Sequence, residues 1–125
     1  MIALISMTQE YYAPTPVARA TINKLLDLPA KGDEQDWEIE LSAPDKLDNM
    51  FALMDAGVLN FEERSALALL LMYSVDEIYR EGGDTSALFP RLKSLLTADP
   101  DVLGRMRYYW GHLHLSEAIM QQVLG

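Results

Sequence analysis

The chain has 125 residues, half of them hydrophobic, with 10 lysines and arginines against 19 aspartates and glutamates, which gives a formal net charge of −9. A chain of this length can bury a hydrophobic core without disulfides or metals. The sequence contains no cysteine, which excludes disulfides, cysteine-ligated metal centres and a thiolate nucleophile. The acidic balance disfavours direct binding of nucleic acid, because that role needs a surface rich in lysine and arginine.

The sequence lacks the pattern of a secretory signal or a membrane span. Residues 1–7 are apolar, but no basic region precedes them, and a secretory signal begins with one. The longest apolar run, Ala66 to Tyr73, has eight residues, far short of the roughly 20 that a spanning helix needs. We therefore expect a cytoplasmic protein that does not engage a membrane.

The first predicted elements are a strand and a helix. Residues 2–7 are apolar and rich in branched side chains, a composition typical of a short strand. Thr15 and Pro16 then provide a helix cap and a first-turn proline, and apolar side chains recur every three to four residues after them. The sequence therefore predicts a helix over 17–28 that ends before Pro29.

Residues 29–44 form an irregular segment in which acidic side chains are concentrated. Within it, residues 37–41 alternate between apolar and acidic side chains in the order Trp-Glu-Ile-Glu-Leu. A period of two residues is typical of a half-buried strand. The sequence therefore predicts a small two-stranded β appendage that pairs residues 2–7 with residues 37–41.

Two helices are predicted in the middle of the chain. The first begins after a cap at Ser42 or Asp45, carries an apolar stripe with helical spacing and ends at a glycine. The second begins after the cap Asn60 and ends at a glycine pair. The middle of this second helix, residues 66–73, is apolar on all sides, so we expect it to be the central element of the core.

The last third of the chain predicts two further helices. One is capped within residues 84–86, and the other is capped by Asp99 and has a proline in its first turn. The second helix either breaks near Gly111 and restarts at Ser116, or it continues to Leu124. Both alternatives agree with the apolar spacing of this region.

These elements predict a mainly α fold, a single domain over residues 1–125 built as a bundle of five to six helices with the β appendage beside it. The sequence shows no internal repeat. Arg105 and Arg107 flank the apolar stripe of the last helix, and helical spacing predicts that both side chains point outward.

Catalytic and metal-binding signals are weak. The two histidines, His112 and His114, are two residues apart, whereas zinc-binding histidines on a helix are four apart. Asp76 and Glu77 follow the apolar run of the central helix and are expected on its solvated face. An enzyme or metal-binding protein that uses His112 or His114 with a carboxylate is therefore an alternative, which a pocket joining a histidine to an acid would favour. The sequence assigns no catalytic residue, metal ligand or cofactor.

The negative charge lies in the middle of the chain and is densest in one segment. Residues 33–48 contain seven acidic side chains against Lys46 alone, a net charge of −6. Residues 49–84 carry −5, and residues 1–32 and 85–125 are close to neutral. Such a segment either forms a solvated face that keeps the protein soluble or steers a basic partner toward it. The predicted partner-binding residues are Asp33, Glu34, Asp36, Trp37, Glu38, Glu40, Asp45 and Asp48.

The leading prediction is a non-enzymatic binding protein of inhibitor or toxin-immunity type that docks on a basic protein, such as a nuclease-type toxin or a nucleic-acid-binding protein. In size, acidity and helical content the chain resembles bacterial toxin-neutralising immunity proteins and small phage or plasmid inhibitors. The prediction expects Trp37, as a possible anchor, to be at least partly exposed. The alternative is a helical self-association or scaffold module, in which a homodimer buries the adaptable apolar surface that seven methionines provide.

Overall fold

The computed structural model describes residues 14–32, 34, 36–108 and 113–125. These residues are mainly helical and contain no strand, which confirms the predicted mainly α fold class. The elements in chain order are α2 (Pro16–Leu25), α3 (Trp37–Glu40), the 3₁₀ turn η1 (Pro44–Lys46), α4 (Leu47–Asp55), α5 (Phe61–Arg80), α6 (Leu88–Thr97), α7 (Pro100–Tyr108), α8 (Glu117–Ile119) and the π-helical turn η3 (Met120–Leu124).

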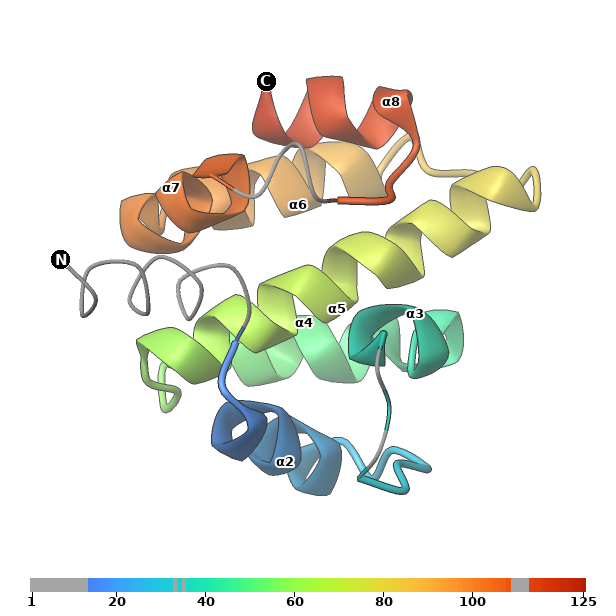
Figure 1. Cartoon of the computed structure of the whole chain (residues 1–125). Helices are drawn as coiled ribbons and strands as arrows, with labels where there is room; N and C mark the ends of the chain where they lie inside the picture. The colour runs from blue at the N-terminus through green and yellow to red at the C-terminus, as the bar shows by residue number, and fades with distance from the viewer. Residues whose placement is uncertain (1–13, 33, 35, 109–112) are drawn as a thin grey trace, which may run out of the picture.

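Helix α5 is the central element of the fold. Figure 1 shows it running through the middle of the molecule, with α2, α3 and α4 on one side and α6, α7 and α8 on the other. Five of these helices (α2, α3, α4, α6 and α7) contact α5 directly, and η3 packs on α6 and α7. Residues 65–76 of α5 are all buried as a result, which confirms the predicted core helix. None of the helices in the described part of the chain is long and apolar enough to cross a bilayer.

Both ends of α5 lie where the sequence predicts them. At the start, the Asn60 side chain accepts a hydrogen bond from the Glu63 N–H (2.8 Å), and the Glu63 carboxylate accepts one from the Asn60 N–H (2.9 Å). This reciprocal pair satisfies two N–H groups that the helix leaves unpaired. At the end, Gly82 adopts a φ of +79°, which lets the Gly83 N–H reach back to the carbonyl of Ile78 (2.8 Å).

The predicted strand over residues 37–41 is wrong, because Trp37–Glu40 form the short helix α3. Residues 2–7, its predicted partner, lie outside the described residues. The helical turn places Trp37 and Leu41 four residues apart on the inner side, where both are buried, and leaves Ile39 44% exposed. It also pairs the Leu41 N–H with the Trp37 carbonyl (2.9 Å), a bond that a strand without a neighbour would lack.

Some of the predicted helix caps are confirmed, and others are wrong. Ser42 and Asp45 do not cap α4, since η1 precedes it and the Ala43 N–H is bonded instead by the Ser74 hydroxyl of α5 (3.0 Å). Residues 84–86 do not cap α6 with a side chain either, and the helix begins later, at Leu88. The side-chain caps that the structure confirms are Thr15, Asn60 and Asp99.

The C-terminal region follows the first of the two predicted alternatives. Residues 113–116 are not helical, and α8 begins immediately after Ser116; Gly111 lies outside the described residues. Arg107 is exposed as predicted, but Arg105 is only 1% exposed. The outward prediction for Arg105 is wrong because Glu62 at the start of α5 pairs with its guanidinium, which offsets the cost of burying the charge.

Candidate functional site

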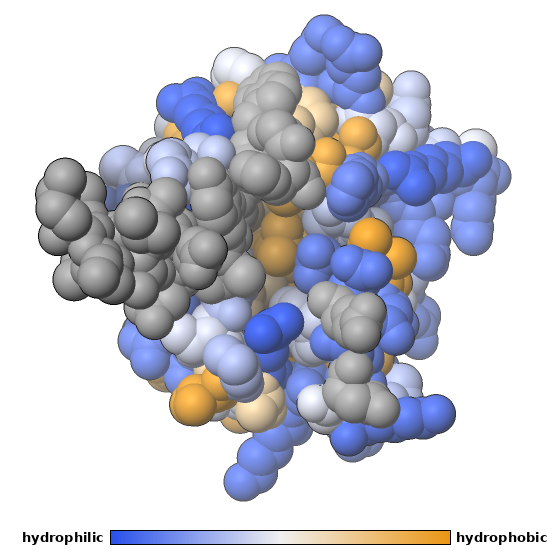
Figure 2. Space-filling model, viewed as in Figure 1, coloured by the Kyte–Doolittle hydropathy of each residue, from blue (hydrophilic) through white to orange (hydrophobic). Residues whose placement is uncertain are grey.

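Four of the predicted acidic side chains are exposed in and around α3, η1 and α4. The acidic surface is defined by these four residues, Asp36, Glu40, Asp45 and Asp48. The Asp36 N–H donates to the Glu40 carboxylate (3.0 Å), which brings those two residues together. Asp45 lies in η1 and Asp48 in the first turn of α4, three residues further on. On the side of the molecule shown in Figure 2, apolar patches are small and separate, and hydrophilic side chains dominate.

Glu34 and Trp37 do not join this surface. The Glu34 carboxylate accepts hydrogen bonds from the N–H groups of Lys31 (2.7 Å) and Gly32 (3.2 Å) in its own turn, and the bond from Lys31 lowers the pKa of Glu34. Trp37 is only 2% exposed, and its Nε1 donates to Asn23 Oδ1 of α2 (2.8 Å). The expectation of a partly exposed Trp37 is therefore wrong. Asp33 lies outside the described residues.

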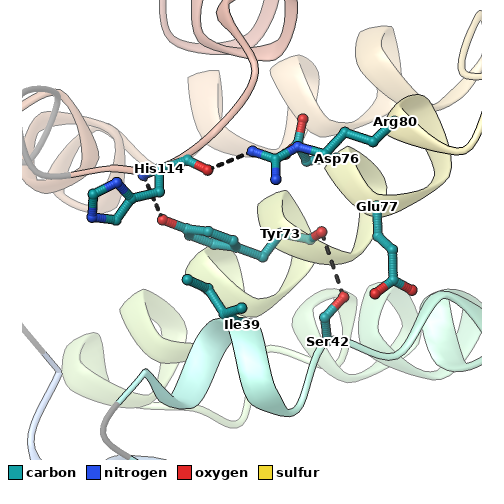
Figure 3. Close-up of a pocket in the computed structure, with 7 residues that line it drawn as sticks. All are labelled: Ile39, Ser42, Tyr73, Asp76, Glu77, Arg80 and His114. Carbon is teal, nitrogen blue, oxygen red and sulfur yellow. Dashed lines mark hydrogen bonds and ion pairs between the residues drawn. The ribbon is translucent and has the colours of Figure 1, made fainter.

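A pocket of about 140 Å³ lies between α3 and α5, beside residues 113–116 (Figure 3). It joins a histidine to two acids, the arrangement that would favour an enzyme. The residues that line it are Ile39, Ser42, Tyr73, Asp76, Glu77, Arg80 and His114. Its chemistry depends on how many of these groups are already engaged with one another.

Most polar groups of the pocket hold residues 113–116 against α5. The Arg80 guanidinium lies 2.7 Å from the Asp76 carboxylate and donates to the His114 carbonyl (2.7 Å). The Ser116 N–H donates to Asp76 Oδ1 (3.2 Å), and the His114 N–H donates to the Tyr73 hydroxyl (2.8 Å). The prediction of a solvated Asp76 is wrong: the residue is 2% exposed, because Arg80 and Ser116 take the place of water around its carboxylate.

His114 takes part in this network through its backbone alone. In Figure 3 its imidazole points away from Asp76 and Arg80, and the residue is exposed. No hydrogen bond or ion pair joins the imidazole to a carboxylate within the described ranges. Those ranges also hold no group of three or more histidine, cysteine or acidic residues that could bind a metal ion. His112 lies outside them.

Comparison with known proteins places the chain in no family. No protein-family model matches the chain, and neither a curated protein nor a solved structure does. Its function therefore has to be inferred from its own residues.

Glu38 of α3 is half-buried. Burial raises the pKa of Glu38, and the nearby Asp36 carboxylate raises it further, while Arg19 and His114 lower it. The net direction is upward, so the ionised form of Glu38 is disfavoured in the folded protein. Burial raises the pKa of the Tyr73 hydroxyl, and the negative charge of the Glu38 carboxylate raises it further.

Glu38→Gln is expected to raise the free energy of unfolding at neutral pH. The folded protein binds the Glu38 proton more tightly than the unfolded chain does, so the ionised carboxylate costs stability above its folded pKa. This cost fades as the pH falls below the ordinary value of 4.5, where Glu38 is protonated in both states. Urea unfolding of both proteins at several pH values measures the difference.

The control for this prediction is Glu40→Gln, which makes the same charge change on the exposed side of the same helix. If Glu38→Gln raised the free energy of unfolding by the same amount from neutral pH to well below 4.5, the effect would not come from ionisation of Glu38.

Sequence reasoning missed most of the residues that build the pocket. The spacing of Asp76 and Arg80, four residues apart on one helix, is a signal that could have paired them. No comparable signal links Tyr73 to His114, because these residues are 41 positions apart and meet through a backbone N–H.

Proposed function

We propose that the chain is a non-enzymatic binding protein, a single helical domain, that docks on a basic partner protein through the acidic surface. One observation carries the proposal: none of the four carboxylates of the acidic surface has an ion pair with a lysine or arginine of the described residues. Lys46, the one base of residues 33–48, instead donates to the carbonyls of Leu26 (2.9 Å) and Asp27 (2.8 Å) at the end of α2. The surface therefore keeps its negative charge.

An unneutralised acidic surface has two properties that suit a basic partner. It accelerates encounter with a positively charged protein, and it penalises partners that are themselves acidic. A partner that binds nucleic acid is positive because it must hold phosphate, and carboxylates on this surface could occupy the same groove. An inhibitor or toxin-immunity protein fits this description. The buried Trp37 leaves Ile39 as the exposed apolar side chain of α3 available to such a contact.

The engagement of the pocket groups argues for binding over catalysis. General acid–base chemistry needs a histidine or carboxylate that faces the reacting atoms. Asp76 and Arg80 are paired with each other and with residues 113–116, and the His114 imidazole points away from both. These contacts support a structural role for the network.

A matched pair of double variants tests the proposal, with the partner first isolated by affinity capture from the native organism. The test variant is Glu40→Lys with Asp48→Lys. The control is Glu81→Lys with Asp101→Lys, which changes the net charge by the same amount. Glu81 lies at the C-terminal end of α5, and Asp101 lies in the first turn of α7. We expect the test variant to slow association about tenfold or more at low salt and the control to have a much smaller effect.

Salt provides the second measurement, because screening weakens interactions between exposed charges. The difference between the test and control variants should shrink as ionic strength rises. A captured partner whose association rate ignores salt and is the same for both variants would refute docking through the acidic surface.

A further inference from the structure

We propose that the pocket between α3 and α5 receives one lysine or arginine side chain of the basic partner. This inference rests on the proposed function, since it names the group of the partner that the pocket recognises. Its basis is the charge, the size and the position of the pocket.

The pocket has an excess of negative charge. Among its lining residues, Asp76 and Glu77 are acidic and Arg80 is basic, but Arg80 is already paired with Asp76 (2.7 Å). Glu77 has no ion pair within the described residues. A cation entering the pocket would therefore meet Glu77 without displacing an internal partner.

The size and walls of the pocket suit a single long cationic side chain. Its volume is about 140 Å³, and an enclosed cavity of about 150 Å³ holds a molecule the size of benzene. Ile39 and the ring of Tyr73 provide apolar walls for an aliphatic stem, and lysine and arginine bury such stems while their charged ends stay in polar surroundings. In Figure 3 the Ser42 hydroxyl and the Glu77 carboxylate lie on one side, where the charged end would be bound.

The pocket and the acidic surface share helix α3. Ile39 of α3 lines the pocket, and the carboxylate of the following residue, Glu40, belongs to the acidic surface. A partner held by the acidic surface would lie across α3 and could place a side chain in the pocket. The acidic surface would then set the rate of association, and the pocket would select the partner by one inserted side chain.

Nuclear magnetic resonance on the full-length chain tests this directly with small probes. The probes are the N-acetyl methylamides of lysine and arginine, and the control probe is that of norleucine, which has an apolar side chain similar in length to lysine. We expect both cationic probes to shift the amide resonances of Ile39, Ser42 and Glu77 at millimolar concentration, and norleucine to leave them unchanged.

Two matched variants assign the shifts to the pocket. Glu77→Gln removes the unpaired carboxylate and should weaken cationic-probe binding at least threefold. Glu81→Gln makes the same charge change one turn further along α5, outside the pocket, and should leave binding unchanged. Unperturbed amide spectra away from the pocket show that each variant is folded.

The outcomes separate this inference from the proposed function. Equal shifts with norleucine, or shifts that survive Glu77→Gln, would overturn the cationic subsite while leaving the acidic surface as a docking site. With the captured partner, Glu77→Gln should shorten the lifetime of the complex relative to Glu81→Gln. A shorter lifetime with Glu77→Gln, combined with no effect of reversing Glu40 and Asp48, would keep the subsite and reject docking through the acidic surface.

Discussion

Trp37→Ala is expected to lower the free energy of unfolding by about 3–5 kcal/mol, the usual cost of truncating a buried aromatic residue. Trp37 is 2% exposed and belongs to the hydrophobic core between α2, α3 and α5. Alanine would leave a cavity where the indole packs, and it would remove the bond from Nε1 to Asn23 (2.8 Å). Chemical unfolding of the two proteins measures the difference.

Two further variants separate packing from binding. Trp37→Phe keeps an aromatic ring but loses the Nε1 donor, so it should cost less, about 1–2 kcal/mol. Ile39→Ala, on the exposed side of α3, should change stability little. If Trp37→Ala left stability unchanged and abolished binding of the captured partner, Trp37 would contact the partner. That result would contradict a structural role for Trp37 in the core.

Glu62→Ala is expected to lower the free energy of unfolding by about 3 kcal/mol, the low end of the cost of breaking a buried ion pair. Arg105 is 1% exposed, and Glu62 pairs with its guanidinium. The low end applies because the Glu62 side chain is itself 34% exposed. Glu62 also accepts a hydrogen bond from the Thr15 N–H (3.1 Å), so its loss weakens the contact between the start of α2 and α5.

A double-mutant cycle isolates the ion pair from the other contacts of the two residues. Arg105→Met keeps an unbranched apolar chain in place of the aliphatic part of arginine and removes the guanidinium, and combining it with Glu62→Ala removes both charges. The double variant should be more stable than Glu62→Ala alone, because it also removes the buried charge that Glu62 helps to balance. Glu81→Ala, at the exposed acid that directly follows α5, is the control. Additive effects of the two single changes would contradict a direct interaction.

The elements that the sequence predicts well are those in which neighbouring residues supply the whole signal. Helix α5 is the clearest case: Asn60 and Glu63 cap it, an apolar run fills its middle and Gly82 ends it. Each of these signals acts within a few residues and depends only on helix geometry. Residues 37–41 show the opposite, since their alternation of apolar and acidic side chains fits both a strand and one helical turn.

For the candidate site, too, the sequence predicts some features and the tertiary structure decides others. The sequence alone determined that the negative charge is concentrated in residues 33–48, because charge can be counted without knowing the fold. Only the tertiary structure decided which of those residues a partner can reach. It buried Trp37 against α2 and used Lys46 to hold the end of α2, so the acidic surface has no ion pair with a lysine or arginine of the described residues.

The pocket and the buried Arg105 depend entirely on contacts between distant parts of the chain. Tyr73 meets His114 across 41 positions, and Arg105 meets Glu62 across 43. Sequence periodicity describes one element at a time, so it assigns a charged side chain to solvent unless its own neighbours offer a partner. The sequence therefore determined the helices and the location of the charge. Tertiary packing decided burial and pairing, because the partners that make burial of a polar group affordable come from other elements.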